Sequence, residues 1–188
     1  LRLGIEAVFL DEKAQRRRRR RQTLSARMAR LGGIWSGRYF FEAVAQRQHL
    51  PSAASAAVAQ ALIAAGVPTQ ISDNVRGALW LKLILNCAYN AVSAITQLPY
   101  GKTAIGEGVQ AVMQDVVAEC LAVARAEGVQ VAGDVDAGVR MIFDTMPGQF
   151  SSTAQDLARG KKSEIDYLNG LIVRRGTAQG IATPANRV

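Results

Sequence analysis

An apolar segment of the chain carries three polar side chains at intervals of four residues: Lys82, Asn86 and Asn90. Residues spaced by four in an α-helix drift by about 40° per step, so these side chains would share one stripe of the helix surface. Their neighbours are leucine, isoleucine and cysteine, which indicates a helix that is buried apart from the stripe. Buried polar groups are costly without partners, so the stripe must face another polar group, ordered water or a ligand, which makes it a candidate site. Structural hydrogen bonds between helices explain the same spacing equally well.

A second polar cluster follows at 151–156 (SSTAQD) and 161–170 (KKSEIDYLNG). Ser151 and Ser152 stand where a short helix would begin, and free backbone N–H groups there can hold an anion such as a carboxylate. Plain N-capping is the commoner role of such serines. Glu164 is expected in the first turn of the last helix, where its charge favours the helix dipole. Gly170, inside that helix, predicts a close approach of another helix.

The elements that must position these residues are helices. We expect them over about 52–65, 73–98, 108–127, 135–146, 151–158 and 163–179, with Gly or Pro marking most of their ends. The segment 67–71 is expected to be a short strand, so that 51–71 forms one α-then-β unit typical of the rim of an α/β domain. The predicted fold is therefore mainly α over 72–188, preceded by a remnant α/β edge.

Charge divides the chain at about residue 50. The formal net charge is +8; residues 1–50 hold 12 basic and 4 acidic side chains, and residues 51–188 hold 11 of each. This distribution argues against a uniformly basic nucleic-acid-binding domain. We expect 1–50 to be an irregular basic leader, disordered or foreign to the fold. Phosphate binding by the six arginines at 16–21 is the less favoured alternative.

The remaining reactive residue types give no metal site. Cys87 and Cys120 lie in apolar helical patterns and are expected to be buried thiols in a reducing cytosol, and His49 has no second ligand near it in sequence. The most apolar stretch, 78–92, is interrupted by lysine and asparagine, and acidic residues interrupt the first apolar segment. We therefore expect no membrane span and no signal peptide, and predict a cytoplasmic protein.

Together, the two polar clusters resemble the C-terminal helical domain of the ketopantoate reductase (2-dehydropantoate 2-reductase) family. The resemblance covers about 51–188 and follows the family's motifs in their order. It rests on Trp80, Lys82, Asn86 and Asn90, on Ser151, Ser152, Gln155 and Asp156, on 163–170, and on Gly180, Ile181, Pro184 and Asn186.

The resemblance implies NADPH-dependent reduction of the C2 ketone of ketopantoate, a small 2-keto acid, to pantoate for pantothenate and coenzyme A synthesis. It implies Lys82 as the general acid. It also implies that Asn86 and Asn90 bind the substrate and that Ser152 holds its carboxylate. Glu164 would lie beside the cofactor and help to orient the lysine. The implied fold is a helical domain of the 6-phosphogluconate dehydrogenase-like type, and a homodimer is compatible with it.

The first part of the sequence departs from the family. Members begin with a Rossmann domain whose Gly-x-Gly-x-x-Gly turn holds the cofactor pyrophosphate, and 1–50 contain no such motif. Only 51–71 resembles the end of that domain, and Tyr100 and Gln149 stand where some members carry asparagine. The alternative hypothesis is a non-catalytic helical module that dimerises or binds a small acid.

Overall fold

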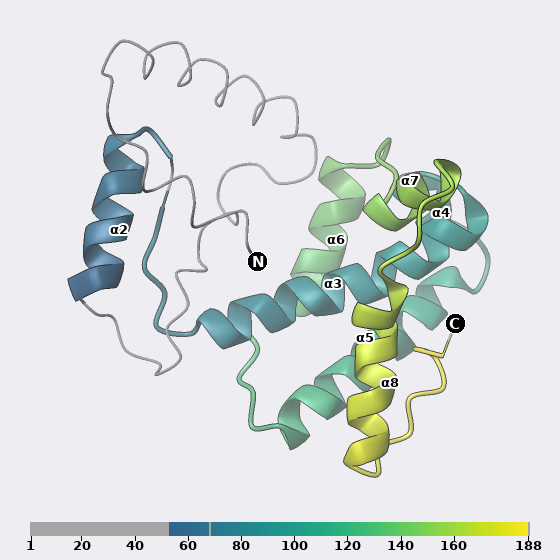
Figure 1. Cartoon of the computed structure of the whole chain (residues 1–188). Coiled ribbons are helices and arrows are strands. Elements are labelled where there is room, and N and C mark those ends of the chain that lie inside the picture. Colours follow the sequence, from purple (N-terminus) through teal and green to yellow (C-terminus); the bar gives the residue numbers. More distant parts are fainter. Residues whose placement is uncertain (1–52, 68, 188) are drawn as a thin grey trace.

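The computed structural model describes residues 53–67 and 69–187, and all regular secondary structure in these ranges is helical (Figure 1). The elements are α2 (Ala53–Ala64), α3 (Val75–Thr96), α4 (Tyr100–Ala104), α5 (Val109–Ala126), α6 (Val135–Thr145), α7 (Ser152–Ala158), the 3-10 turn η2 (Ile165–Tyr167) and α8 (Asn169–Ala178).

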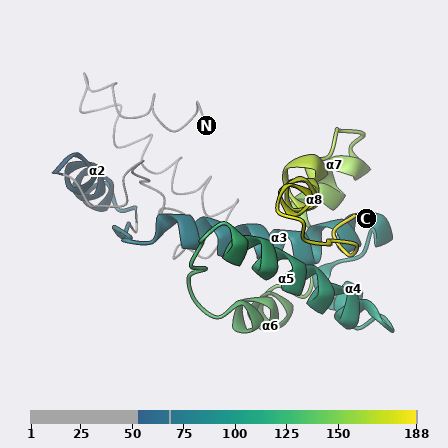
Figure 2. The ribbon, with the colours of Figure 1, turned by 90° about the horizontal axis from the view of Figure 1, so that it is seen from below.

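Helix α3 is the central element of the bundle. It packs against α5, α6 and α7, and α8 packs against α5. Figure 2 shows α7 and α8 on one side of α3 and α6 on the other. A long central helix with neighbours on opposite sides can present site residues along its length while the same helix contributes to the core.

Local sequence explains where the helices begin and end. The Asn74 side chain accepts the Gly77 N–H at 3.0 Å and caps α3, and Asp134 accepts the Ala137 N–H at 3.0 Å and caps α6. Such caps satisfy N–H groups that have no partner within the helix. Gly128 follows α5 with a φ of +64°, a left-handed conformation that favours glycine. These local signals explain why most predicted helices are confirmed to within a few residues.

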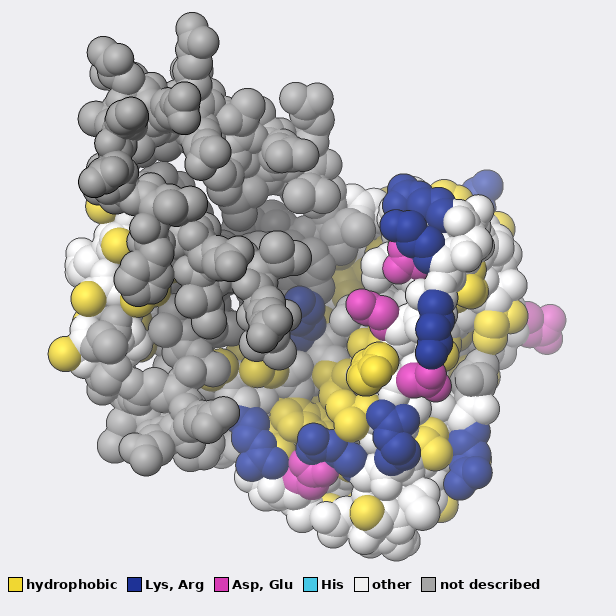
Figure 3. All heavy atoms as spheres, viewed as in Figure 1, with side chains coloured by type: hydrophobic (Ala, Val, Ile, Leu, Met, Phe, Trp, Pro, Cys, Tyr) yellow, Lys and Arg dark blue, Asp and Glu magenta, His cyan; other side chains and the backbone are white. Residues whose placement is uncertain are grey.

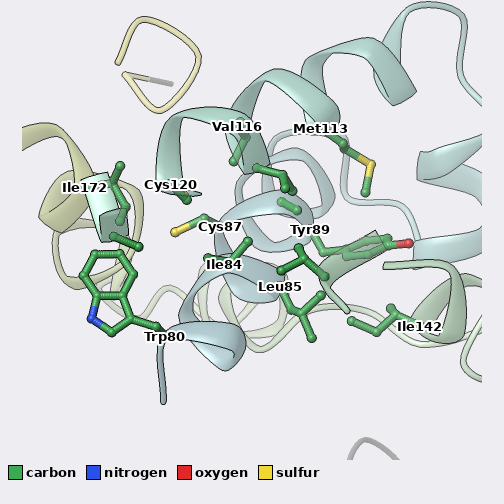
Figure 4. Packing of buried hydrophobic residues seen from close by; sticks show 14 of the residues in the cluster. Trp80, Ile84, Leu85, Cys87, Tyr89, Met113, Val116, Cys120, Ile142 and Ile172 are labelled. Carbon is green, nitrogen blue, oxygen red and sulfur yellow. The ribbon is translucent and has the colours of Figure 1, made fainter. Parts of the chain in front are cut away.

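The core lies where α3, α5 and α8 meet (Figure 4). Ile84 and Cys87 of α3, Val116 and Cys120 of α5, and Ile172 of α8 are at most 2% exposed. Full burial of each large aliphatic side chain stabilises the fold by about 1.5–3 kcal/mol. Both cysteines are free and buried, as the apolar pattern predicted.

The expected strand at 67–71 is wrong, because residues 67 and 69–71 form no regular structure. The Val67 N–H donates to the Leu62 carbonyl at 2.9 Å, and this bond closes the end of α2. A strand needs a neighbouring strand to satisfy its backbone groups, and residues 53–67 and 69–187 provide none.

The expected continuous helix over 163–179 is also wrong. It divides at Leu168, whose φ and ψ of −106° and −103° lie outside the helical region, into η2 and α8. Glu164 therefore precedes a 3-10 turn and does not lie in the first turn of α8. Gly170 meets the nearby Ile165 carbonyl, 3.3 Å from an added Cβ, so its neighbour is local and the expected helix–helix approach does not occur there.

By length and composition, α3 could cross a membrane, since it has 22 residues and a mean hydropathy of 1.3 in its most apolar window. However, 56% of that window is buried inside the structure. Core helices of globular proteins pass the same test, so α3 is weak evidence for a span.

Several expectations concern residues outside the described ranges. They are the basic leader 1–50 with its arginines at 16–21, His49, and the capping role of Ser52.

Candidate active site

The polar stripe lies on a single uninterrupted helix, α3, and its three side chains differ in burial. Lys82 is exposed, Asn86 is half-buried and Asn90 is only 3% exposed. The stripe therefore descends from the surface at Lys82 into the interior at Asn90. Within 80–90 only Lys82 is exposed, whereas Leu79 and Ile95, on either side of this segment of α3, are 48% and 67% exposed.

The amides of Asn86 and Asn90 make no hydrogen bond to any residue in the described part of the chain. The sequence left open whether these amides join helices together, and the structure gives them no such role. Asn90 is only 3% exposed, and polar groups in such positions are usually bonded to protein, water or a ligand, so water or a ligand is its expected partner. Its carbonyl and NH2 groups can both accept from and donate to a polar ligand.

Ser151 and Ser152 lie at the start of α7 and have different environments. Ser151 is fully buried and caps α7, its hydroxyl accepting the Ala154 N–H at 2.9 Å. Ser152 is exposed. Because α7 packs against α3, Ser152 lies on an element that is in contact with the helix of the polar stripe. The two adjacent serines therefore differ: Ser151 is structural, and the Ser152 hydroxyl makes no hydrogen bond to the residues that the structure describes.

Glu164 is exposed and lies five residues before Asn169, whose amide donates to the Cys87 carbonyl of α3 at 3.2 Å. The segment that carries Glu164 is therefore tied to α3 beside Asn86. The hydroxyl of Ser163, and not Glu164, accepts the Ile165 N–H at 2.9 Å. The Glu164 carboxylate consequently has no capping duty and makes no hydrogen bond within the described ranges.

The surface of this region mixes apolar and charged side chains. In Figure 3, hydrophobic side chains gather at the centre of the viewed face, bordered by Lys or Arg and Asp or Glu. At the start of α3, Glu127 forms ion pairs with Arg76 and Arg175, and the Arg175 guanidinium lies 5.8 Å from the centre of the Trp80 ring. Trp80 is thus a packing residue under a structural ion pair.

Sequence reasoning missed one residue of this region, Ser93. It is fully buried on α3, and its hydroxyl accepts the Ser151 N–H at 3.2 Å. Its position three residues after Asn90 continues the polar stripe, which is the only pattern that could have identified it. Residues 53–67 and 69–187 contain no group of three or more His, Cys, Asp or Glu side chains suited to a metal.

Known proteins are similar to this chain in sequence. The family described as "Ketopantoate reductase PanE/ApbA C terminal" matches residues 74–188, more than half of the chain. The chain belongs to this family. The 2-dehydropantoate 2-reductase of Pyrobaculum aerophilum is 37% identical over 139 residues, which cover 74% of this chain and 50% of the relative. That of Caulobacter vibrioides is 49% identical over 111 residues, covering 57% of this chain and 37% of the relative.

Solved structures are also similar to this chain, and one of them is of the same family. A PanE/ApbA family ketopantoate reductase from Ralstonia eutropha JMP134 is 69% identical, with a TM-score of 0.70 over 73% of this chain and 46% of that one. A D-mandelate dehydrogenase with NADH and anilino(oxo)acetate is 27% identical, with a TM-score of 0.66 over 73% of this chain and 47% of that one. The chain thus spans about half the length or less of these ketopantoate reductase relatives, and the shared part is the helical domain.

Proposed function

We propose that this protein supplies the substrate-binding, proton-donating half of an NADPH-dependent 2-dehydropantoate 2-reductase. One observation carries the proposal: in a chain of the ketopantoate reductase family, the amides of Asn86 and Asn90 lack hydrogen-bond partners among the described residues, on the helix that presents Lys82 to solvent. The substrate would be 2-dehydropantoate, a 2-keto acid, and the product pantoate, a precursor of coenzyme A.

The proposed roles follow from the burial of each group. The Asn86 and Asn90 amides bind the polar groups of the keto acid, because the carbonyl of each amide can accept a hydrogen bond and its NH2 group can donate one. The Ser152 hydroxyl donates to the substrate carboxylate. Lys82, at the exposed end of the stripe, lies where its ammonium can reach the ketone oxygen and afterwards regain a proton from water.

The residues fit the nicotinamide end of a cofactor better than its phosphate end. The Glu164 carboxylate is exposed and makes no hydrogen bond within the described ranges, so it can accept hydrogen bonds from the hydroxyl or amide groups of a dinucleotide. No Gly-x-Gly-x-x-Gly sequence, the turn that typically holds a dinucleotide pyrophosphate, occurs in residues 53–67 and 69–187. NADPH, when bound, supplies the hydride that adds to the C2 carbon.

The chemical role of this chain is then to neutralise the negative charge that develops on the ketone oxygen. Negative charge develops on that oxygen as C2 is reduced, and Lys82 Nζ donates a proton to it. A positioned general acid contributes about 10²–10⁴-fold to a rate. Asn86 and Asn90 hold the keto acid against α3, and Ser152 fixes its carboxylate, so that the ketone faces the lysine.

The domains, cellular location and assembly of the protein are expected to be those of such a reductase. Residues 51–71 would be the end of a cofactor-binding domain, and 72–188 the helical domain. The protein would act in the cytoplasm, and a homodimer is its expected assembly. A dimeric ketopantoate reductase from Staphylococcus aureus is similar in fold, with a TM-score of 0.65.

Titration of the purified chain with NADPH, followed by cofactor fluorescence, tests the proposal. Saturable binding at micromolar concentration, together with ketopantoate-dependent oxidation of NADPH, is the expected result for an active enzyme. Binding of ketopantoate without NADPH would favour the alternative, a non-catalytic helical module that binds a small acid. If neither ligand binds, the proposal is wrong for this chain.

The alternative has one observation in its favour, the absence of a Gly-x-Gly-x-x-Gly turn from the sequence. Sedimentation with and without ketopantoate distinguishes its two forms. A dimer that forms without the ligand indicates a dimerisation module, and a monomer that binds the acid indicates a binding module.

A further inference from the structure

We propose that Ser93 and Ser151 form a buried hydroxyl clamp that sets the position of Ser152 relative to Asn90. They would therefore be positioning residues for recognition of the substrate carboxylate. This inference rests on the proposed function for the identity of the ligand. It adds two residues that do not touch the substrate but hold together the two elements that do.

The clamp is a short chain of hydrogen bonds between α3 and the start of α7. The Ser151 N–H donates to the Ser93 hydroxyl oxygen at 3.2 Å, and the Ser93 hydroxyl donates to the Leu98 carbonyl at 2.9 Å. The Ser151 hydroxyl donates in turn to the carbonyl of Asn90 at 3.4 Å. The backbone of one proposed substrate-binding residue is thus bonded directly to the residue that precedes the other.

Each of the two serine hydroxyls is bonded both as a donor and as an acceptor. Each hydroxyl accepts one N–H and donates to one carbonyl, and both residues are 0% exposed. In a buried position such bonds are directional and no water competes for them, so they fix orientation as well as distance. An alanine pair would fill the space but would not determine how α7 is rotated about its first residue.

The loop that leads into α7 is held from a second direction. The Tyr100 N–H donates to the Gln149 carbonyl at 2.8 Å, and the Gly101 N–H donates to the Pro147 carbonyl at 2.9 Å. The loop therefore enters α7 along a fixed line beside the start of α4. These bonds fix the direction of the loop before α7. The hydrogen bonds of Ser93 and Ser151 then determine where Ser152 lies.

The end of α3 adds one weaker contact to α7. The Gln97 side-chain amide donates to the Ala154 carbonyl at 3.4 Å, and Gln97 has a left-handed φ of +50°. This contact lies in the first turn of α7, at the residue whose N–H the Ser151 hydroxyl accepts, and it does not involve the backbone of Ser151. It keeps α7 near α3 when the clamp is removed, so loss of the clamp should misplace Ser152 without releasing the helix.

The test is a double-mutant cycle for ketopantoate affinity in the whole chain, measured by calorimetry. We expect Ser93→Ala and Ser152→Ala each to weaken binding about tenfold, and the double variant to be no weaker than Ser152→Ala alone, because the clamp acts through Ser152. Thr96→Ala is the matched control, since its hydroxyl lies on the same helix and donates to the Val92 carbonyl of that helix at 2.7 Å. It should leave the affinity unchanged.

Amide hydrogen exchange on the same variants separates failure of the clamp from failure of the proposed function. Ser93→Ala should speed exchange of the Ser151 N–H at least tenfold, with the core amides of α5 unchanged. Unchanged exchange at Ser151 would overturn the clamp, whatever ligand binds. Multiplicative losses of affinity in the cycle, or an equal loss in Thr96→Ala, would overturn its positioning role. If the parent chain binds no ketopantoate, the proposed function fails, and the carboxylate role of the clamp fails with it.

Discussion

The carbonyl oxygen of Gln130 lies 2.1 Å from the point that a Cβ atom on Gly77 would occupy. The same carbonyl accepts the Asn74 side-chain amide at 2.9 Å, and Asn74 caps α3. Glycine at position 77 therefore permits a close crossing between the first turn of α3 and the connection that follows α5. This contact fixes the end of α3 that leads to the polar stripe.

Gly77→Ala should destabilise the protein although it adds a residue with higher helix propensity. In an exposed helix the change would stabilise by about 1 kcal/mol, but here the added methyl group overlaps the carbonyl and the capping amide, and overpacking costs about 1–3 kcal/mol. Urea unfolding measures the difference. Gly148→Ala is the control, since nothing lies within 4 Å of its added Cβ, and an unchanged or higher stability for both variants would contradict the close crossing.

Asn186→Ala should lower the free energy of unfolding by about 1–3 kcal/mol, because it leaves buried polar groups without partners. The Asn186 amide donates to the Glu119 carboxylate at 2.8 Å and accepts the Asn169 amide at 3.1 Å. Asn86→Ala, which removes no hydrogen bond within the described ranges, should change stability by less than about 1 kcal/mol. Thermal melting compares them, and equal losses would mean that Asn86 is also structural.

Lys82→Ala tests the proposed general acid in a form of the protein that turns over ketopantoate. We expect kcat to fall by about 10²–10⁴-fold, since the variant removes the proton donor. The Kd for NADPH should stay within about twofold, because no cofactor-binding role is assigned to this lysine. Lys102→Ala, at an exposed lysine of α4, is the control. An equal loss of turnover and of NADPH affinity would instead indicate a structural lysine.

Alkaline pH should destabilise the fold through two tyrosines. Burial raises the pKa of Tyr89 and that of Tyr100 from 10.0 to about 12, and their rings pack edge to face with centres 5.0 Å apart. Between pH 10 and 12 the unfolded chain loses protons that the folded chain keeps, so stability is complete below pH 10 and falls as the pH rises through that window.

Melting temperatures measured from pH 8 to 12 check this dependence. The double variant Tyr89→Phe, Tyr100→Phe should show a smaller fall than the parent, because a phenyl ring has no proton to lose. The variant also loses the hydrogen bond from the Tyr89 hydroxyl to the Val139 carbonyl, 2.8 Å, so its melting temperature should be lower at every pH. Parallel curves for parent and variant would rule out the tyrosines as the cause.

Local chemistry explains how much of the fold could be predicted from the sequence. Asn74 and Asp134 cap helices by bonding to N–H groups three residues ahead, and Gly128 ends one through its own φ, so the ends of α3, α5 and α6 were accessible without the structure. Elements that depend on partners far away in the sequence could not be predicted in this way. The strand expected at 67–71 has no neighbouring strand in the described part of the chain, and the predicted last helix divides at Leu168.

For the candidate site, the sequence by itself determined that Lys82, Asn86 and Asn90 share a stripe, because the period of a helix is a local property. It also determined the family, through residue types in a fixed order. Only the tertiary structure decided which asparagine amides are used by the fold, as in Asn169 and Asn186, and which make no hydrogen bond to the residues that the structure describes, as in Asn86 and Asn90. The physical reason is that a side chain's hydrogen-bond partner is set by packing between segments far apart in the sequence, which spacing along one helix cannot encode.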